Sequence, residues 1–341
     1  MDERHFVTLL MFVVGLTGIF FNGICTVHFL YPKVHSSFGI LCSAHTFSNF
    51  MIMLIFVVWT VPVNLWDLGW GVNRVGRAFG TLQWWFWFLS IYTQVFLAVN
   101  RFLAINTPAF YHRIFTIRNT KLIAIAIITF SLWHFVFNQF DGCELLFYSD
   151  TYQWYFTENA TCAYIIIEYL ELYYISVLFA FACLLDLCTL ISLIRHLKVV
   201  ARDRPFSKND VRFFLQSCIT GFVFVGVTFC FHLGYKLFDE NDKLGQFLVS
   251  TFAWECTHSL DGIIVVLFNK ELRRIFTAPN RVFANRIHSQ QHSTGREHCG
   301  SGHSPNSKKL HLYYPGSVAS QTTTKTTNHS IKEQPGSHNY M

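Results

Sequence analysis

A few ionisable side chains lie within long apolar stretches of this chain. Asp261 precedes the apolar run 262–268, and Arg101 and Asp186 lie within two other apolar stretches. A carboxyl group at the centre of a membrane-spanning helix costs about 3 kcal/mol on insertion scales, so such residues usually have a role inside a helix bundle. The chemistry that these residue types indicate is ion pairing and hydrogen bonding between helices.

The composition indicates an integral membrane protein. Hydrophobic residues make up 52% of the chain and charged residues only 13%, whereas soluble domains carry about 25% charged residues. Pro, Gly and charged residues divide the chain into seven apolar segments of about 20 residues or more, the length that crosses a bilayer. We therefore predict an all-α bundle of seven transmembrane helices over residues 6–268. The expected spans are 6–31, 39–62, 79–103, 120–140, 164–194, 212–236 and 247–268.

Three further segments flank the predicted bundle. Residues 1–5 form a short N-terminus that leaves no room for a ligand-capture domain, which favours a small-molecule ligand over a protein ligand. Residues 269–278 are basic and amphipathic, which suits a helix on the cytoplasmic membrane surface. Residues 279–341 are rich in Ser, Thr, His and Asn and lack apolar periodicity, so we expect a disordered cytoplasmic tail.

Charge in the connecting segments predicts the orientation. Positive charge is enriched in the segments that follow spans 3, 5 and 7, which are therefore expected on the cytoplasmic side. The opposite segments hold most of the acidic residues, which places the N-terminus outside the cell and the C-terminus in the cytoplasm. The basic segment between spans 5 and 6 contributes Arg195, Lys198, Arg202, Arg204 and Lys208.

The outer segment between spans 4 and 5 holds two cysteines and a glycosylation acceptor. Cys143 and Cys162 fall where an oxidising compartment would allow them to pair, and two unpaired thiols are the alternative. Asn159 begins an Asn-Ala-Thr acceptor in the same segment.

The inner end of span 3 carries a recognisable motif. The run from Asn100 through Arg101 and Phe102 continues Leu-Ala-Ile, with Pro and Tyr following, and it resembles the signature of rhodopsin-like G-protein-coupled receptors. The resemblance implies that Arg101 is the conformational switch and that span 7 carries a second switch at Asp261 and Gly262. This chain has Asn100 where the family has an acid, so the ion pair that restrains the arginine is missing. Asp186, on the inner half of span 5, could approach Arg101 and replace that restraint.

Polar residues within the spans need partners, because unsatisfied polar groups are expensive in hydrocarbon. Asn22, Asn49 and Asp261 are expected to form one cluster, in which the residue types of spans 2 and 7 are exchanged relative to the receptor superfamily. Three separate local hydrogen bonds are the alternative.

Several aromatic and polar residues fall toward the predicted outer ends of the spans. Together they could form an aromatic ligand pocket with a few polar anchors, although interface aromatics and ordinary interhelical packing are the better explanation for any single one of them. Glu255 and His258 are favoured, because ionisable groups at that depth seldom serve packing alone. The full candidate set is Gln83, Trp84, Trp87, Glu168, Glu171, His232, Trp254, Glu255 and His258.

The finer pattern resembles the nematode chemoreceptors called serpentine receptor class X. Asn100 with Arg101, the entry to span 6 at 212–217, and Trp254 with His258 carry this resemblance over residues 10–276. It implies a chemosensory receptor in the plasma membrane of sensory cilia that binds a small molecule and signals to a heterotrimeric G protein. The basic segment after span 5 would contact the G protein, although it also satisfies the positive-inside rule.

The sequence indicates other partners and two alternatives. No nucleophile set, phosphate-binding glycine loop or metal-ligand spacing is evident, so we expect no enzymatic activity, no cofactor, no metal and no nucleic-acid partner. Membrane lipid is a further expected partner, beside the small molecule and the G protein. A transporter or channel that uses the acids Asp186, Glu255 and Asp261 is one alternative. A receptor that reaches the surface without coupling is the other.

Overall fold

In the computed structural model, the described residues are 2–30, 36–69, 73–140, 142–156, 160–200, 208–239 and 241–277. They lie within one compact unit, Met1–Asn285. The predicted disordered tail, the acceptor Asn159 and the basic residues Arg202 and Arg204 lie outside the described residues.

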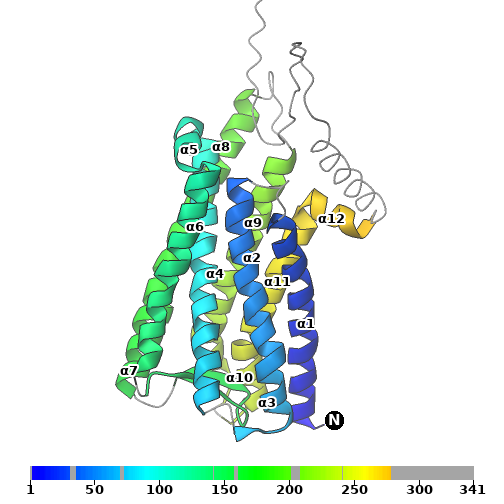
Figure 1. Ribbon diagram of the computed structural model, residues 1–341, viewed down its shortest axis with the longest axis vertical. Helices are drawn as coiled ribbons and strands as arrows, with labels where there is room; N and C mark the ends of the chain where they lie inside the picture. Colours follow the sequence, from blue (N-terminus) through cyan, green and yellow to red (C-terminus); the bar gives the residue numbers. More distant parts are fainter. Residues whose placement is uncertain are drawn as a thin grey trace, which may run out of the picture. The chain divides into compact units, whose positions relative to one another are not determined.

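Long helices run side by side along the axis of this unit (Figure 1). A two-stranded hairpin, residues 145–156, and α10 lie at the end where the chain begins, and α5 and α12 lie at the opposite end. The helices are α1 (Glu3–Leu30), α2 (Ser37–Ile55), α3 (Val61–Leu65), α4 (Arg74–Asn106), α5 (Pro108–Ile114), α6 (Ile117–Ser131), α7 (Ala160–Tyr164), α8 (Ile175–Val200), α9 (Lys208–His232), α10 (Lys243–Phe247), α11 (Ala253–Phe268) and α12 (Lys270–Thr277).

Among the described residues, six helices are long and apolar enough to cross a membrane. They are Glu3–Leu30, Ser37–Leu65, Arg74–Asn106, Ile117–Val136, Ile165–Arg195 and Leu215–His232. The predicted seventh span corresponds to α11 and the two segments before it. It is less apolar than the others because it carries Glu255, His258 and Asp261, which are all buried.

Short π-helical segments interrupt three of the spans near the end that holds the hairpin. They are η2 (Phe56–Thr60), η5 (Ile165–Tyr174) and η7 (Leu248–Phe252). The 3-10 segments η4 (Leu132–Gln139) and η6 (Gly234–Leu237) end α6 and follow α9. A π-helical turn rotates the side chains that follow it and is often found at functional sites. The apolar pattern did not predict these segments.

The first helix begins earlier than the sequence predicted. Helix α1 begins at Glu3, so most of the expected N-terminal segment 1–5 is helical. Arg4 continues the helix past the apolar run because its guanidinium forms an ion pair with Asp67, at 2.8 Å, in the connection between α3 and α4. This arginine lowers the pKa of the Asp67 carboxyl, and Ser149 also donates to that carboxyl.

The predicted amphipathic helix 269–278 is present as α12. Asn269 caps it by accepting from the backbone N–H of Glu271, and Leu272 is buried beneath it. The imidazole of His28 in α1 lies 3.6 Å from the Glu271 carboxyl and lowers the pKa of that carboxyl. These contacts join α12 to the inner end of α1.

A two-stranded antiparallel sheet, which the sequence analysis did not predict, covers the end of the bundle that is predicted to face outside. Strands β1 (Leu145–Tyr148) and β2 (Gln153–Phe156) pair with Leu145 opposite Phe156. The predicted disulfide between Cys143 and Cys162 is present and ties the hairpin to the start of α7.

Gly80 allows the hairpin to approach α4. A Cβ atom at Gly80 would lie 1.8 Å from the backbone oxygen of Leu145, a distance that no side-chain movement can relieve. Arg77, three residues earlier on α4, forms an ion pair with the buried carboxyl group of Glu144. The hairpin is therefore held against α4 by both close packing and charge.

We predict that Gly80→Ala destabilises the purified protein by about 1–3 kcal/mol, because the added methyl group must displace the strand. The midpoint of thermal unfolding in detergent measures this. Gly226→Ala is the matched control, because no atom lies within 4 Å of a Cβ added there and alanine favours the helix. Equal midpoints for wild type and Gly80→Ala would contradict the packing described.

Candidate functional site

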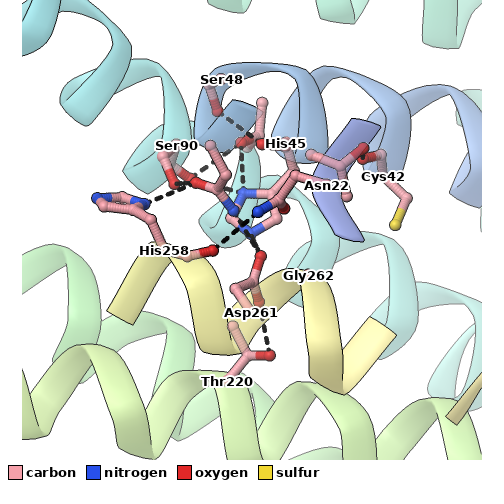
Figure 2. Close-up of polar contacts among 12 residues, drawn as sticks. Asn22, Cys42, His45, Ser48, Ser90, Thr220, His258, Asp261 and Gly262 are labelled. Carbon is pink, nitrogen blue, oxygen red and sulfur yellow. Dashed lines mark hydrogen bonds and ion pairs between the residues drawn. The ribbon is translucent and has the colours of Figure 1, made fainter. Parts of the chain in front are cut away.

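Asp261 is at the centre of a polar network inside the bundle, where its side chain is 1% exposed. Its Oδ2 accepts a hydrogen bond from Asn49 Nδ2 of α2 at 2.6 Å, and its Oδ1 accepts from Thr220 Oγ1 of α9 at 2.9 Å. His45 Nε2, also from α2, lies 2.8 Å from Oδ2. Figure 2 shows the carboxylate between His45 on one side and Thr220 on the other. One carboxyl group thus joins α2, α9 and α11.

The surroundings of His45 indicate how its ring is oriented. Its Nδ1 lies 3.1 Å from the Ser90 carbonyl oxygen, which can only accept, so Nδ1 carries a proton. Its Nε2 lies 2.8 Å from Asp261 Oδ2, at ion-pair distance but without hydrogen-bond geometry. A carboxyl group buried at this depth needs a neighbour of this kind, which can carry the opposite charge.

Asn49 extends the network from Asp261 toward α4 and α11. Its Oδ1 accepts from Ser90 Oγ at 2.8 Å and faces His258 Nδ1 at 2.8 Å. Because an amide oxygen cannot donate, His258 Nδ1 must be the protonated nitrogen. Its other nitrogen, Nε2, is buried and has no hydrogen-bond partner in the described part of the chain. Figure 2 shows this end of the ring directed away from the other labelled residues.

Asn22 of α1 joins the network through backbone atoms. Its Nδ2 donates to the carbonyl oxygen of His258 at 2.9 Å and to that of Gly18 at 3.0 Å. The predicted cluster of Asn22, Asn49 and Asp261 therefore lies together in space, although Asn22 does not bond Asp261 directly. A Cβ atom at Gly262 would lie 2.9 Å from the Asn22 backbone nitrogen. Gly262 thus provides close packing, and α11 continues through it without interruption.

A second buried ion pair lies nearer the inner end. Arg101 of α4 donates to Asp186 of α8, with Nη2 at 3.1 Å from Oδ1 and 3.3 Å from Oδ2. Ser217 Oγ of α9 also donates to Asp186 Oδ2, at 3.3 Å. The structure thus places Asp186 where the sequence analysis expected a substitute for the missing acid. Asn100 is buried beside Arg101, and its Nδ2 has no partner among the residues described.

The candidate ligand residues do not form a single cluster. The ring of Trp87 lies 5.7 Å from Trp254 and 5.4 Å from His258, so these three side chains lie together. Phe224, which the sequence analysis did not select, contacts Trp87 at 5.9 Å.

The other members of the set lie elsewhere. Glu171 is close to the indole of Trp84, and Glu168 is close to His232. Glu255 is fully buried, and its carboxyl group lies against Gly15 of α1. A Cβ atom added at Gly15 would be 3.1 Å from Glu255 Oε1. A role of Glu255 and His258 in binding a ligand stays a prediction.

The predicted G-protein contacts are only partly described. Arg195 is exposed on the inner part of α8. Lys198 lies in α8 and Lys208 begins α9, which places both at the inner end of the bundle. Phe102, the third member of the expected motif, is half-buried in α4.

Three residues of the network were missed from the sequence, namely His45, Ser90 and Thr220. His45 gave a usable signal, because it lies four residues before Asn49 and therefore on the same helix face. Ser90 and Thr220 gave none, since single hydroxyl residues in apolar helices usually bond their own backbone.

Known proteins resemble this chain over most of its length. Residues 12–269 match the model of the family described as "Serpentine type 7TM GPCR chemoreceptor Srx". A relative named Serpentine receptor class X 45, from Caenorhabditis elegans, is 23% identical over 268 residues, which is 73% of this chain and 74% of that protein.

We predict that His45→Phe and Asp261→Asn each destabilise the receptor by about 3–5 kcal/mol, because each leaves one partner of a buried pair without the other. The double variant should lose less than the sum of the two single losses, with a coupling of about 1–3 kcal/mol. Thermal unfolding of the purified receptor measures all four forms. Asp261→Asn combined with Gly226→Ala is the additive control. Additive losses for His45→Phe and Asp261→Asn would show that the two side chains are not coupled.

Proposed function

The chain belongs to the family of serpentine seven-helix chemoreceptors of class Srx, and from this premise we propose that it binds an external small molecule and signals to a heterotrimeric G protein through Arg101 and the Asp261 region. As a member of this receptor family it is a multi-pass membrane protein and belongs to no known enzyme family. We further propose that it lies in the plasma membrane of sensory cilia, with its N-terminus outside and its C-terminus in the cytoplasm.

The observation that carries this proposal is the way in which two carboxylates hold α9. Ser217 and Thr220 are three residues apart, on one face of α9. Ser217 donates to Asp186 at 3.3 Å, and Thr220 donates to Asp261 at 2.9 Å. Moving the inner half of α9 away from α8 and α11 breaks both hydrogen bonds. Asp186 keeps Arg101 when α9 leaves, and Asp261 keeps its partners on α2, so the movement costs hydrogen bonds and not the other partners of either carboxylate.

This arrangement offers a route from an external ligand to the inner end. The rings of Trp87 and Trp254 contact His258, and His258 bonds Asn49. Asn49 in turn bonds Asp261, which holds Thr220 of α9. A ligand that displaces the His258 ring therefore changes the hydrogen bonds that hold α9. The ligand shifts the equilibrium only as far as it binds the state with α9 released more tightly than the resting state.

The inner end supplies the surface for the proposed G protein. Movement of α9 would uncover Arg101, whose guanidinium is 8% exposed in this state. The exposed Arg195 and the beginning of α9 lie at the same end of the bundle. We propose that this basic end contacts the G protein, as the segment after span 5 does in the sequence-based expectation.

We predict that Asp186→Asn raises agonist-free second-messenger output about fivefold or more, because a neutral amide holds Arg101 less tightly than a carboxylate does. Arg101→Ala should abolish both agonist-free and odorant-evoked output. Reporter cells with surface labelling measure these signals at matched receptor density. Asp150→Asn, in the exposed turn of the hairpin, is the control for a conservative loss of charge.

Two other results would contradict the proposed signalling function. No signal from wild type or from Asp186→Asn at good surface density, with several G proteins, would favour a receptor that does not couple. Current or uptake that survives Arg101→Ala would favour a channel or transporter.

A further inference from the structure

Three polar side chains near the outer ends of three helices are buried without partners. Thr60 of η2, Gln83 of α4 and Thr251 of η7 are each at most 1% exposed. The hydroxyl groups of both threonines, and both the oxygen and the nitrogen of the Gln83 amide, have no hydrogen-bond partner in the described part of the chain. A buried hydroxyl or amide without a partner costs about 1–3 kcal/mol. Such groups in one place indicate a missing binding partner.

The three side chains lie in one layer of the bundle. Beneath them, Trp254 contacts both Phe56, at 5.9 Å, and Trp87, at 5.7 Å, so η2, α4 and α11 converge on these rings. Thr60 is four residues from Phe56, Gln83 is four from Trp87 and Thr251 is three from Trp254. Each polar residue is therefore within about one helical turn of its aromatic neighbour.

In each of the three pairs, the polar residue lies on the outer side of its aromatic neighbour. The chain runs outward in α2 and η2 and inward in α4 and α11, so later numbers on η2 and earlier numbers on α4 and η7 lie in the same direction. Trp59, next to Thr60 on η2, stacks on Phe79 of α4 at 4.5 Å, which keeps η2 and α4 together at the level of the polar layer.

The surrounding backbone is also unusual at this level. Thr60 and Thr251 both lie in π-helical segments, which often mark functional sites. The hairpin packs on α4 at Gly80, one turn from Gln83, and so closes the layer from outside.

On the basis of the proposed receptor function, we propose that Thr60, Gln83 and Thr251 bind an uncharged small molecule that has both a hydrogen-bond donor and an acceptor. Its apolar part rests on Phe56, Trp87 and Trp254. Two hydroxyl groups and one amide can both donate and accept, which matches an alcohol or an amide. Glu255, which follows Trp254, is buried with both carboxyl oxygens unpartnered among the described residues, a setting that disfavours its charged form. A carboxylate or an ammonium group bound in this layer would therefore find no opposite charge to compensate its lost hydration.

The burial of these groups gives a signature that a structural role would not share. If they wait for a ligand, replacing them by apolar groups of the same shape removes a penalty and stabilises the free receptor. We therefore expect Thr60→Val, Gln83→Leu and Thr251→Val, combined, to raise the unfolding midpoint of the free receptor. Thr257→Val is the matched control, because this buried hydroxyl on α11 already donates to the Ala253 carbonyl at 2.8 Å. The control should not raise the midpoint.

The test is thermal unfolding of the purified full-length receptor with six-carbon probes at up to millimolar concentration. The probes are 1-hexanol, hexanamide, hexanoate, hexylammonium and hexane. We expect the alcohol or the amide to raise the wild-type midpoint, and the ionic probes and hexane to have no effect. The triple variant should bind the neutral probe about tenfold or more weakly, and Thr257→Val should bind it as wild type does.

Three outcomes would overturn the assignment. They are a shift by the ionic probes alone, a shift that survives in the triple variant, and no shift with either neutral polar probe. Because the measurement needs no G protein, it is separate from the proposed function. A neutral probe that binds through these residues without any second-messenger signal would support the site and count against coupling.

Discussion

The structure depends on the cost of placing charge within hydrocarbon. Asp261, Asp186 and Arg101 are each at most 8% exposed, in helices that cross the membrane. A charge at this depth is tolerated only when opposite charge and hydrogen bonds surround it. Because no single helix can provide these partners, each charged group takes them from other helices. The same requirement that makes the residues acceptable therefore fixes how α2, α4, α8, α9 and α11 are arranged.

The two charged centres have one helix in common, and this makes the arrangement suitable for switching. Both carboxylates keep partners on other helices without α9, which adds only a hydroxyl group to each of them. A helix held by ion pairs would be too costly to release, and a helix held by packing alone would not respond to changes in a polar network. Two neutral donors on one face give an intermediate cost, about 1 kcal/mol each. Ligand binding can supply a difference of this size.

The sequence was sufficient for the fold class and for part of the site. Hydropathy and two motifs predicted the seven-helix receptor architecture, and the family match confirms it. Asp186 and Asp261 could be selected because a carboxyl group in an apolar span has few explanations. The contributions of Ser90 and Thr220 could not be predicted, because a hydroxyl in a helix gives the same pattern whether it faces a carboxylate or its own backbone. The position of Glu255 against Gly15 of α1 could not be predicted either, because side-chain directions at the start of α11 depend on the π-helical turn of η7, which sequence patterns do not reveal.

The most direct test of this account is the distance between the inner ends of α9 and α6. Spin labels on unnatural residues placed at Leu215 and Ile117, which are 45% and 43% exposed, would allow double electron–electron resonance to measure this distance. The native cysteines would stay unlabelled. The account predicts that Ser217→Ala with Thr220→Val shifts the distances to longer values in the absence of ligand, whereas Thr257→Val leaves them unchanged. Identical distance distributions in wild type and the double variant would contradict the claim that these two hydroxyl groups hold α9 in the resting position.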